Sequence, residues 1–312
     1  MRFPFQIPEN REFDCVGFGT NAVDFLISVP KYPEFDSKVE VSDYVQEAGG
    51  EIATAMVGLS RLGMRAAYAG RFGKEPTGDF GLRSLAEEGV DVRFAEQIEG
   101  AVTQIAFIVI DERNGERTVI WKRDPKLAYS AEEAPIEAAR IGKVLHFTPL
   151  DTEACIRLAT EAKAHGTIVS IDIDNLFEGI DELLPLVDIL IASEGFIEKI
   201  TGDTDKRTGL AKLNEKYGCP VSGVTLGESG SLVFCGGEYF ESRGYEVPGG
   251  CKDTTGAGDS FRAGFIYGLL KEMTIEDAAR SANAVAALKC RAVGARTSLP
   301  TEAELREILE QG

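Results

Sequence analysis

The sequence predicts an α/β protein in which a mostly parallel sheet is covered by helices on both faces. Short apolar runs rich in β-branched residues alternate along the chain with segments of helical periodicity, such as Ile52, Met56, Leu59 and Leu62. Neither a fixed-period repeat nor a low-complexity tract interrupts this alternation. Strands that alternate with helices are typical of parallel sheets, because each parallel connection has to cross over the sheet.

The individual elements follow from the same pattern. Core strands are expected at 14–20, 65–70, 143–147, 167–173, 187–192 and 221–225. Helices are expected at 52–62, 152–165, 206–217, 256–271 and 275–292. We expect a single domain over residues 1–312, a length that α/β domains reach.

Two segments, at about 25–46 and 101–122, break the alternation and indicate hairpins. The first has β-rich runs around the turn 30–33, which contains two prolines, and the second has them around the turn 111–115. The runs are 25–29, 38–42, 101–110 and 116–121. Two inserted hairpins can pair into a small separate sheet. The alternative is that they only extend the edge of the main sheet.

The composition excludes several classes of protein. Lys and Arg number 33 and Asp and Glu number 51, which gives a net charge of −18. This charge argues against nucleic acid and anionic membranes as partners. The six scattered cysteines form no CxxC pair and only two histidines accompany them, so a zinc cluster is not expected. Because no apolar signal core or membrane-length run is visible, we expect a cytoplasmic protein.

The most informative segment is the loop 249–261, Gly-Gly-Cys-Lys-Asp-Thr-Thr-Gly-Ala-Gly-Asp-Ser-Phe, which leads into a helix. Gly256, Ala257 and Gly258 let a ligand approach the backbone, and N–H groups at a helix N-terminus bind anions such as phosphate. Asp259 would repel an anion, but it can accept a proton from a hydroxyl that attacks a phosphoryl group. The alternative is that Asp259 only caps the helix.

The string Asp-Thr-Thr-Gly-Ala-Gly-Asp-Ser-Phe at 253–261 resembles the second signature of the ribokinase-like carbohydrate kinases, the PfkB family. Four further stretches resemble family segments in the same order. They are Gly49-Gly50 before a helix, 68–91, 224–230 and 283–288. The resemblance extends over nearly the whole chain, from Val16 to about Pro300.

This resemblance implies a three-layer α/β/α core with a β-sheet lid formed by the two hairpin insertions. It also implies ATP, Mg²⁺ and a sugar-like alcohol as ligands. Asp259 would be the catalytic base, and the N–H groups of residues 256–258 would form an anion hole. Asp24, Gly49 and Gly50 would contact sugar hydroxyls, although Asp24 can also be explained as a turn residue.

The resemblance also assigns residues to the nucleotide and to metal ions. The nucleotide set is Ser193, Thr225, Gly227, Gly230, Gly256, Gly258 and Asn283. Asp253 and Thr255 match positions that line a K⁺ site in some family members. Many members carry Asn-x-x-Glu after the strand equivalent to 187–192, whereas this chain has Ser193-Glu194-Gly195-Phe196. Glu194 or Glu198 could replace that motif through water, because Mg²⁺ usually keeps several waters.

The residues on the sugar side depart from the family in two respects. Glu51, Ile52, Ala53 and Thr54 follow Gly49-Gly50 where members usually have Asn, so Glu51 and Thr54 are candidate sugar contacts. Basic residues also lie on or beside the two hairpins: Lys38, Arg117, Lys122, Arg123 and Lys126. They either protect exposed strand edges or bind an anionic group of the substrate, with Lys38 and Arg117 the main candidates. Segments 49–55, 193–194 and 287–290 resemble the sulfofructose kinase branch.

The predicted function is therefore ATP-dependent phosphorylation of a hydroxyl of a sugar or sugar derivative, neutral or anionic. One alternative is a nucleoside-type kinase, with Phe18, Phe25, Phe107 and Trp121 as candidates for a base-binding slot. Another is a nucleotide- or sugar-binding regulator without catalysis, supported only by the replaced Asn-x-x-Glu motif. Exposed strand edges in the lid also favour a homodimer through the lid.

Overall fold

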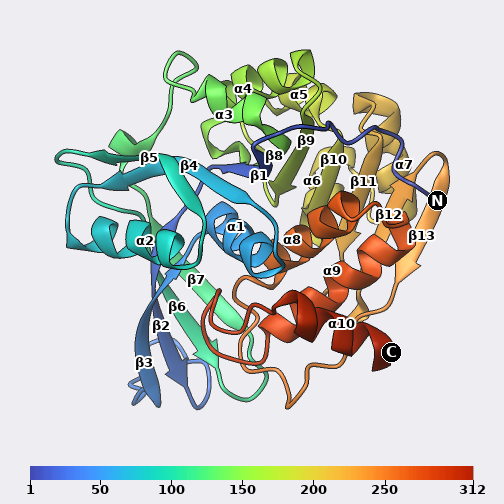
Figure 1. Ribbon diagram of the computed structural model, residues 1–312. Coiled ribbons are helices and arrows are strands. Elements are labelled where there is room, and N and C mark those ends of the chain that lie inside the picture. The colour runs from blue at the N-terminus through green and yellow to red at the C-terminus, as the bar shows by residue number, and fades with distance from the viewer. Residues whose placement is uncertain (312) are drawn as a thin grey trace.

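The computed structural model describes residues 1–311, and a nine-stranded sheet lies at its centre (Figure 1). The strands are β1 (Phe13–Phe18), β4 (Ala66–Gly73), β5 (Asp91–Ile98), β8 (Gly142–Phe147), β9 (Ile168–Ile173), β10 (Ile189–Ser193), β11 (Val221–Thr225), β12 (Ser231–Cys235) and β13 (Glu238–Ser242). Their order is β13-β12-β11-β10-β9-β8-β1-β4-β5. All pairings from β5 to β11 are parallel, and β12 and β13 are antiparallel.

Helices cover both faces of this sheet and bury two separate apolar cores. The helices are α1 (Glu51–Arg61), α2 (Pro76–Glu87), α3 (Ile136–Ile141), α4 (Thr152–Ala164), α5 (Ile180–Leu183), α6 (Glu194–Thr201), α7 (Lys206–Tyr217), α8 (Ala257–Leu270), α9 (Ile275–Lys289) and α10 (Glu302–Gln311). One core contains α1, α8 and α9, and the other contains α4, α6 and α7. The predicted α/β class with both faces covered is therefore confirmed.

A second sheet of four strands, the small sheet, lies at one end of the main sheet (Figure 1). It contains β2 (Ala22–Val29), β3 (Asp43–Gly49), β6 (Ile105–Asp111) and β7 (Arg117–Lys122), in the order β3-β2-β6-β7. The predicted separate sheet is thus present. That the whole chain forms one domain with a lid at 25–46 and 101–122 stays a prediction.

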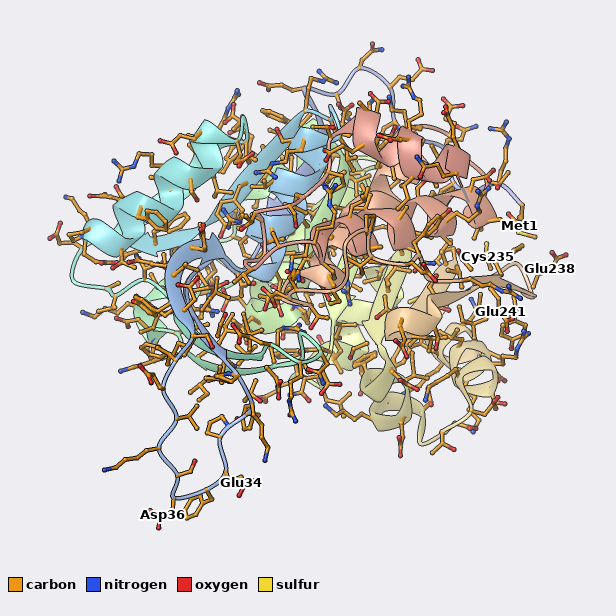
Figure 2. All side chains as sticks on the ribbon, turned by 90° about the horizontal axis from the view of Figure 1, so that it is seen from below. Met1, Glu34, Asp36, Cys235, Glu238 and Glu241 are labelled. Carbon is orange, nitrogen blue, oxygen red and sulfur yellow. The ribbon has the colours of Figure 1, made fainter. Side chains whose placement is uncertain are left out.

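The strand predicted at 38–42 is wrong. These residues belong to the loop between β2 and β3, which projects from the body with Glu34 and Asp36 at its tip (Figure 2). Val39 and Val41 alternate as in a strand, but they are 40% and 49% exposed. The strand instead starts at Asp43, and its end at Ala48 and Gly49 is buried against β2. Burial at that end, rather than the alternation, decides the register.

Several elements were not predicted. The helices α2, α6 and α10 and the strands β5, β12 and β13 lie in segments with mixed polarity or short apolar runs. The helix predicted at 275–292 ends earlier, at Lys289. Across residues 1–311, no helix is long and apolar enough to cross a membrane.

The turn between β3 and α1 requires glycine at two successive positions. A side chain at Gly49 would overlap the carboxylate of Asp24, and one at Gly50 would overlap the backbone of Asn21. Gly50 also has φ = 87°, which side-chain-bearing residues rarely adopt. The Gly49-Gly50 pair therefore lets the start of α1 lie directly against the start of β2.

Replacing Gly50 with alanine tests this close approach. We expect Gly50→Ala to lower the free energy of unfolding by about 1–3 kcal/mol more than Gly166→Ala, because it adds overlap to backbone strain. Gly166 has a similar φ of 72°, but a side chain there would meet nothing within 4 Å. Urea denaturation of both variants measures the difference. Equal losses would show that the space beside Gly50 is not restrictive.

Candidate active site

The candidate site lies where the carboxyl ends of the parallel strands meet the N-terminus of α8. Thr20 and Asn21 follow β1, Asp172 lies near the end of β9, and Ser193 and Thr225 end β10 and β11. Sheets of this kind bind ligands outside the carboxyl ends of their strands. The first turn of α8 reaches this edge because Arg262 donates to the carbonyl of Ile191 in β10, at 3.0 Å from Nη2.

The loop before α8 has the geometry expected of an anion-binding turn. Gly256 is left-handed with φ = 77°, and a side chain there would lie 2.9 Å from the Cβ of Ala295. α8 begins at Ala257, whose own N–H donates to the carbonyl of Thr254 at 3.1 Å. The N–H groups at the start of a helix can receive an anion. Asp259 lies in the first turn of α8 and is half-buried. Residues 256–259 thus form the turn and the start of α8, and their role in catalysis stays a prediction.

Opposing influences set the pKa of Asp259. Burial raises the pKa above the ordinary aspartate value, and four cations, Arg262, Arg117, Lys289 and Arg296, lower it. Arg262 lies in α8 and Arg117 in β7, whereas Lys289 ends α9 and Arg296 lies in the segment after α9. They favour the ionised form, which is the form that can accept a proton.

Two further carboxylates, Asp24 and Glu51, lie near Asp259. Asp24 is 4% exposed, and burial raises its pKa to about 7, with Asp259 adding to the rise and Arg296 opposing it. Burial also raises the pKa of Glu51 to about 7. Glu51 accepts a hydrogen bond from Thr20 Oγ1 at 2.8 Å, which ties the start of α1 to the end of β1. Both side chains can offer oxygens to sugar hydroxyls.

Arg262 is the residue at this site that the sequence reasoning missed. Its Nη2 lies 2.7 Å from Oδ1 of Asp172, and both side chains are buried. A Cβ added to Gly258 would lie 2.8 Å from Nη1 of Arg262, so the guanidinium lies directly beside the proposed anion hole. Its signal was available, because a residue three positions after Asp259 in a helix shares its side of the helix.

Arg296 is buried beneath the proposed sugar-binding residues, where it contacts the turn between β3 and α1. It is 7% exposed, and it donates to the carbonyl of Gly49, to Ser84 Oγ at 3.1 Å and to Thr54 Oγ1 at 3.5 Å. Thr54, predicted as a sugar contact, is completely buried. A ligand could not touch Thr54 without rearrangement, because α1 turns this face toward the interior. Thr54 therefore lies in the interior instead of at the surface of the sugar site, where the sequence analysis placed it.

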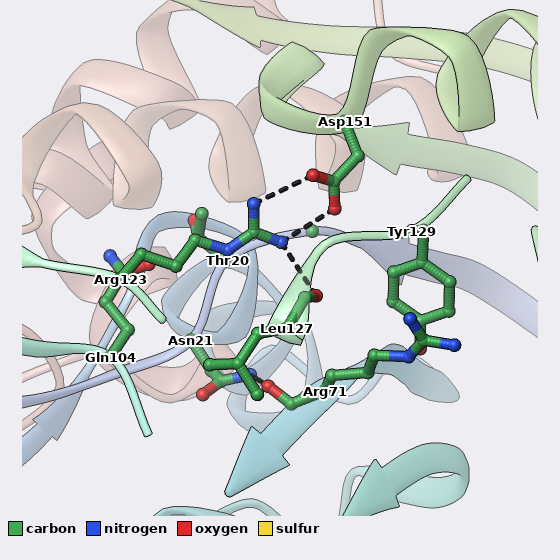
Figure 3. A pocket seen from close by; sticks show the side chains of 9 residues that line it. Thr20, Asn21, Arg71, Gln104, Arg123, Leu127, Tyr129 and Asp151 are labelled. Atoms are coloured by element: carbon green, nitrogen blue, oxygen red, sulfur yellow. Dashed lines mark hydrogen bonds and ion pairs between the residues drawn. The ribbon is translucent and has the colours of Figure 1, made fainter. Parts of the chain in front are cut away.

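Beside the end of β1, a pocket is lined by Thr20, Asn21, Gln104, Tyr129 and two arginines (Figure 3). Arg123 makes two contacts of 2.8 and 2.7 Å with the carboxylate of Asp151. Arg71 lies 3.9 Å above the ring of Tyr129 and pairs with Glu96 and Glu133. Acidic partners thus neutralise both arginines, so the pocket does not present free positive charge.

Of the five basic residues that the sequence placed near the hairpins, Arg123 lines the pocket beside the end of β1, and Arg117 reaches the loop before the proposed anion hole. Its Nη1 donates to Thr254 Oγ1 at 2.8 Å, in the loop before the anion hole. Lys38 is exposed in the projecting loop between β2 and β3. Lys122 pairs with Ile105 on the face of the small sheet opposite Asp24, and Lys126 donates to the carbonyl of Gly100 at 2.7 Å. The register of β7 against β6 decides which face of the small sheet the side chains of Arg117 and Lys122 occupy.

The predicted nucleotide residues gather on the β10–β13 side. Ser193 and Thr225 are directly paired at the ends of β10 and β11. Gly227 and Gly230 form the following turn, both with positive φ. Asn283 in α9 is buried, and its amide donates to Ser231 Oγ at 3.1 Å and to Ser242 Oγ at 3.0 Å. This side chain is therefore already engaged in holding β12 and β13.

Two of the residues predicted to bind metal ions, Glu194 and Asp253, are already paired with lysines. Glu194 Oε1 pairs with Lys206 Nζ at 3.0 Å. Asp253 is completely buried and contacts the ammonium of Lys289. Within the described residues, no group of three or more His, Cys, Asp or Glu side chains could hold a metal ion.

The fold and site define a class of phosphoryl-transfer enzyme, and comparisons with known proteins agree. The family model described as "pfkB family carbohydrate kinase" matches residues 13–302. The ribokinase of Haemophilus influenzae is 28% identical over 94% of this chain and 97% of its own length. The fructokinase of Klebsiella pneumoniae is 32% identical over 85% of this chain and 92% of its own length.

Solved structures agree as well. A putative ribokinase from Agrobacterium tumefaciens has a TM-score of 0.88 and 27% identity, covering 96% of this chain and 98% of that one. A fructokinase from Vibrio cholerae O395, solved with fructose, ADP and calcium ion bound, has a TM-score of 0.77 and 26% identity. The match covers 95% of this chain and 99% of that one. The chain belongs to the PfkB family of carbohydrate kinases, as its sequence motifs indicated, and it is an ATP-dependent sugar kinase.

The raised pKa of Asp24 predicts a pH-dependent stability. A folded pKa of about 7 exceeds the ordinary value of about 4. The folded state therefore holds the proton longer than the unfolded state, and stability is lost as pH rises from about 4 to 7. Asp24→Asn should remove this loss, up to about 1.4 kcal/mol per unit of pKa difference.

Denaturation of wild type and Asp24→Asn at pH 5 and pH 8 measures this effect. The difference between the two proteins carries the information, because other groups titrate in both. Wild type should lose more stability than the variant on going to pH 8. Parallel changes in the two proteins would contradict the assignment of a raised pKa to Asp24.

Proposed function

We propose that this kinase transfers the γ-phosphoryl group of ATP to a sugar hydroxyl, with Asp259 as the catalytic base. The observation that supports it most is the position of Asp259 in the first turn of α8, near two carboxylates and four cations. A base at this point can take the proton of a hydroxyl while the N–H groups beside it receive phosphate oxygens.

Each group would have a separate role. Asp24 and Glu51 would orient the sugar by accepting hydrogen bonds from its hydroxyls. The N–H groups of residues 256–258 would stabilise negative charge that develops on the transferred group, and Arg262 beside Gly258 would add a fixed positive charge. The small sheet would act as a lid that excludes water, which otherwise competes for the phosphoryl group.

Mg²⁺ would be held mainly by the nucleotide. Mg²⁺ usually binds one or two carboxylates together with substrate phosphates and waters. Glu194 is more than half exposed and could contribute through water, although it is paired with Lys206. The ion supplies charge neutralisation at the phosphates when bound.

The small sheet argues against a nucleoside as the substrate. Residues paired across neighbouring strands share a face, so Asp24, Ala106 and Trp121 face the site together. Phe25 and Phe107 stack on each other on the opposite face. Phe18 is 1% exposed and packs against Tyr129. Of the four aromatic candidates for a base-binding slot, Trp121 alone faces the site.

Replacing the base tests this function directly. Asp259→Asn should retain ADP affinity while turnover falls by about 10²–10⁴, the usual range for a general base. Asp277→Asn is a matched control, because it changes an acid in the first turn of α9 whose side chain contacts Thr274 and Arg280, neither of which belongs to the candidate site. ADP release with a panel of neutral, phosphorylated, carboxylated and sulfonated sugars measures both. Near-normal turnover of folded Asp259→Asn would exclude the assignment, and no turnover by wild type with any sugar would favour the regulator.

Arg117 tests whether the sugar carries an anionic group. If Arg117 contacts such a group, Arg117→Ala should raise KM about tenfold or more for that sugar, because hydrogen bonds to charged groups contribute about 1.5–3 kcal/mol. The neutral analogue should be unaffected. Lys38→Ala is the matched control, since that lysine lies in the projecting loop. Equal KM changes for both sugars would instead assign Arg117 to the docking of β7 on Thr254.

We also propose that the outer face of the small sheet is covered by a second copy of the chain. Phe25 stacks with Tyr44 and Phe107 there, and Phe107, Tyr44 and Ile120 are 43%, 54% and 58% exposed. Contiguous apolar surface of this kind marks interaction sites. Light scattering should report a dimer for wild type and a monomer for Phe107→Asp. A monomeric wild type would contradict the proposal.

The cysteines suggest the compartment. All six are free, and five of them are buried. Free thiols persist where the surroundings are reducing, which supports a cytoplasmic location. Recovery of the native enzyme mainly outside the cytoplasm on cell fractionation would overturn it.

A further inference from the structure

The most unusual charge outside the reacting groups is the ammonium of Lys289. This residue ends α9, and its side chain is completely buried. Its Nζ donates to the backbone carbonyl of Asp253 at 2.8 Å and lies 3.8 Å from Oδ2 of the same residue. A buried ammonium is costly unless it is paired, and Asp253 supplies both contacts.

The remaining contacts of Asp253 engage both oxygens of its carboxylate. Its Oδ1 accepts a hydrogen bond from the N–H of Thr255 at 2.8 Å, and its Oδ2 accepts one from the N–H of Gly294 at 2.8 Å. A K⁺ ion needs a shell of several oxygens that replace its hydration water. Here all three oxygens of Asp253 already have donors, and Lys289 supplies the positive charge. Asp253 therefore does not fit the K⁺ site that the sequence suggested, whereas the buried Oγ1 of Thr255 has no hydrogen-bond partner among the described residues.

Lys289 also lies where it can act on the anion-binding loop. Asp253 lies three positions before Gly256, the first residue of the proposed anion hole, and the N–H of Lys252 donates to the carbonyl of Cys290 at 2.9 Å. The end of α9 thus holds the loop at Lys252 and at Asp253. Lys289 is also one of the four cations that favour the ionised form of Asp259.

We propose that Lys289 is a positioning residue whose ammonium takes the place of a monovalent cation, so that this kinase works without K⁺. The charge is built into α9, and it fixes residues 253–256 before ATP arrives. This inference rests on the proposed role of the 256–258 loop in phosphoryl transfer.

The test compares KCl with tetramethylammonium chloride at equal ionic strength, for wild type, Lys289→Met and Lys289→Ala. Wild type should show the same kcat and the same melting temperature in both salts. Lys289→Met keeps the length without the charge, so its kcat should fall about tenfold or more in both salts, with a smaller change in KM. Lys289→Ala opens space for an ion, so K⁺ should raise its melting temperature and restore part of its kcat. Lys271→Met, which removes an exposed lysine after α8, is the control and should behave as wild type.

Each outcome decides the proposal. Activation or thermal stabilisation of wild type by K⁺ would overturn it, and this measurement needs no variant to fold. Wild-type kcat in folded Lys289→Met would also overturn it, because a residue that only fills space can be replaced by methionine. Melting temperatures need no sugar, so they separate failure of this proposal from failure to find a substrate.

Discussion

The ion pair between Arg262 and Asp172 is the contact on which the candidate site depends. It joins the first turns of α8 to the end of β9, with 2.7 Å between Nη2 and Oδ1 and both side chains buried. Such a pair adds little stability compared with apolar residues, but losing one partner leaves a buried charge. Its consequence is positional, because α8 can approach the strand ends only where this pair forms. That approach sets where Asp259 and the proposed anion hole lie.

The site also shows how a protein with a net charge of −18 can receive ATP. Its cations are few and fixed: Arg262, Arg296 and Lys289 are buried, and Arg117 is held by Thr254. Fixed charges in a site that excludes water act more strongly than surface charges, which salt screens. An acidic surface is therefore compatible with a site that holds individual buried cations, and a basic surface patch is not required.

The fold and the helix start that carries the proposed reacting residues were predictable because they depend on local patterns. Strand–helix alternation gave the parallel sheet, and the glycine loop with Asp259 gave the start of α8. The partners of the supporting residues were not predictable, because they depend on contacts between distant segments. Arg262 meets Asp172 across 90 positions, Arg296 reaches Gly49, and Lys289 reaches Asp253. The direction of Lys122 and the burial of Thr54 likewise depend on register and helix orientation, which composition does not reveal.

The most direct test of this account is the pH dependence of kcat/KM for wild type and Arg262→Gln, with both proteins shown to be folded. A base must be ionised to accept a proton, so activity should rise with pH through the pKa of Asp259. Arg262 is the strongest of the groups that lower this pKa against the effect of burial. The account predicts that the rising limb moves to higher pH in Arg262→Gln. A rising limb at the same pH in both proteins would contradict it.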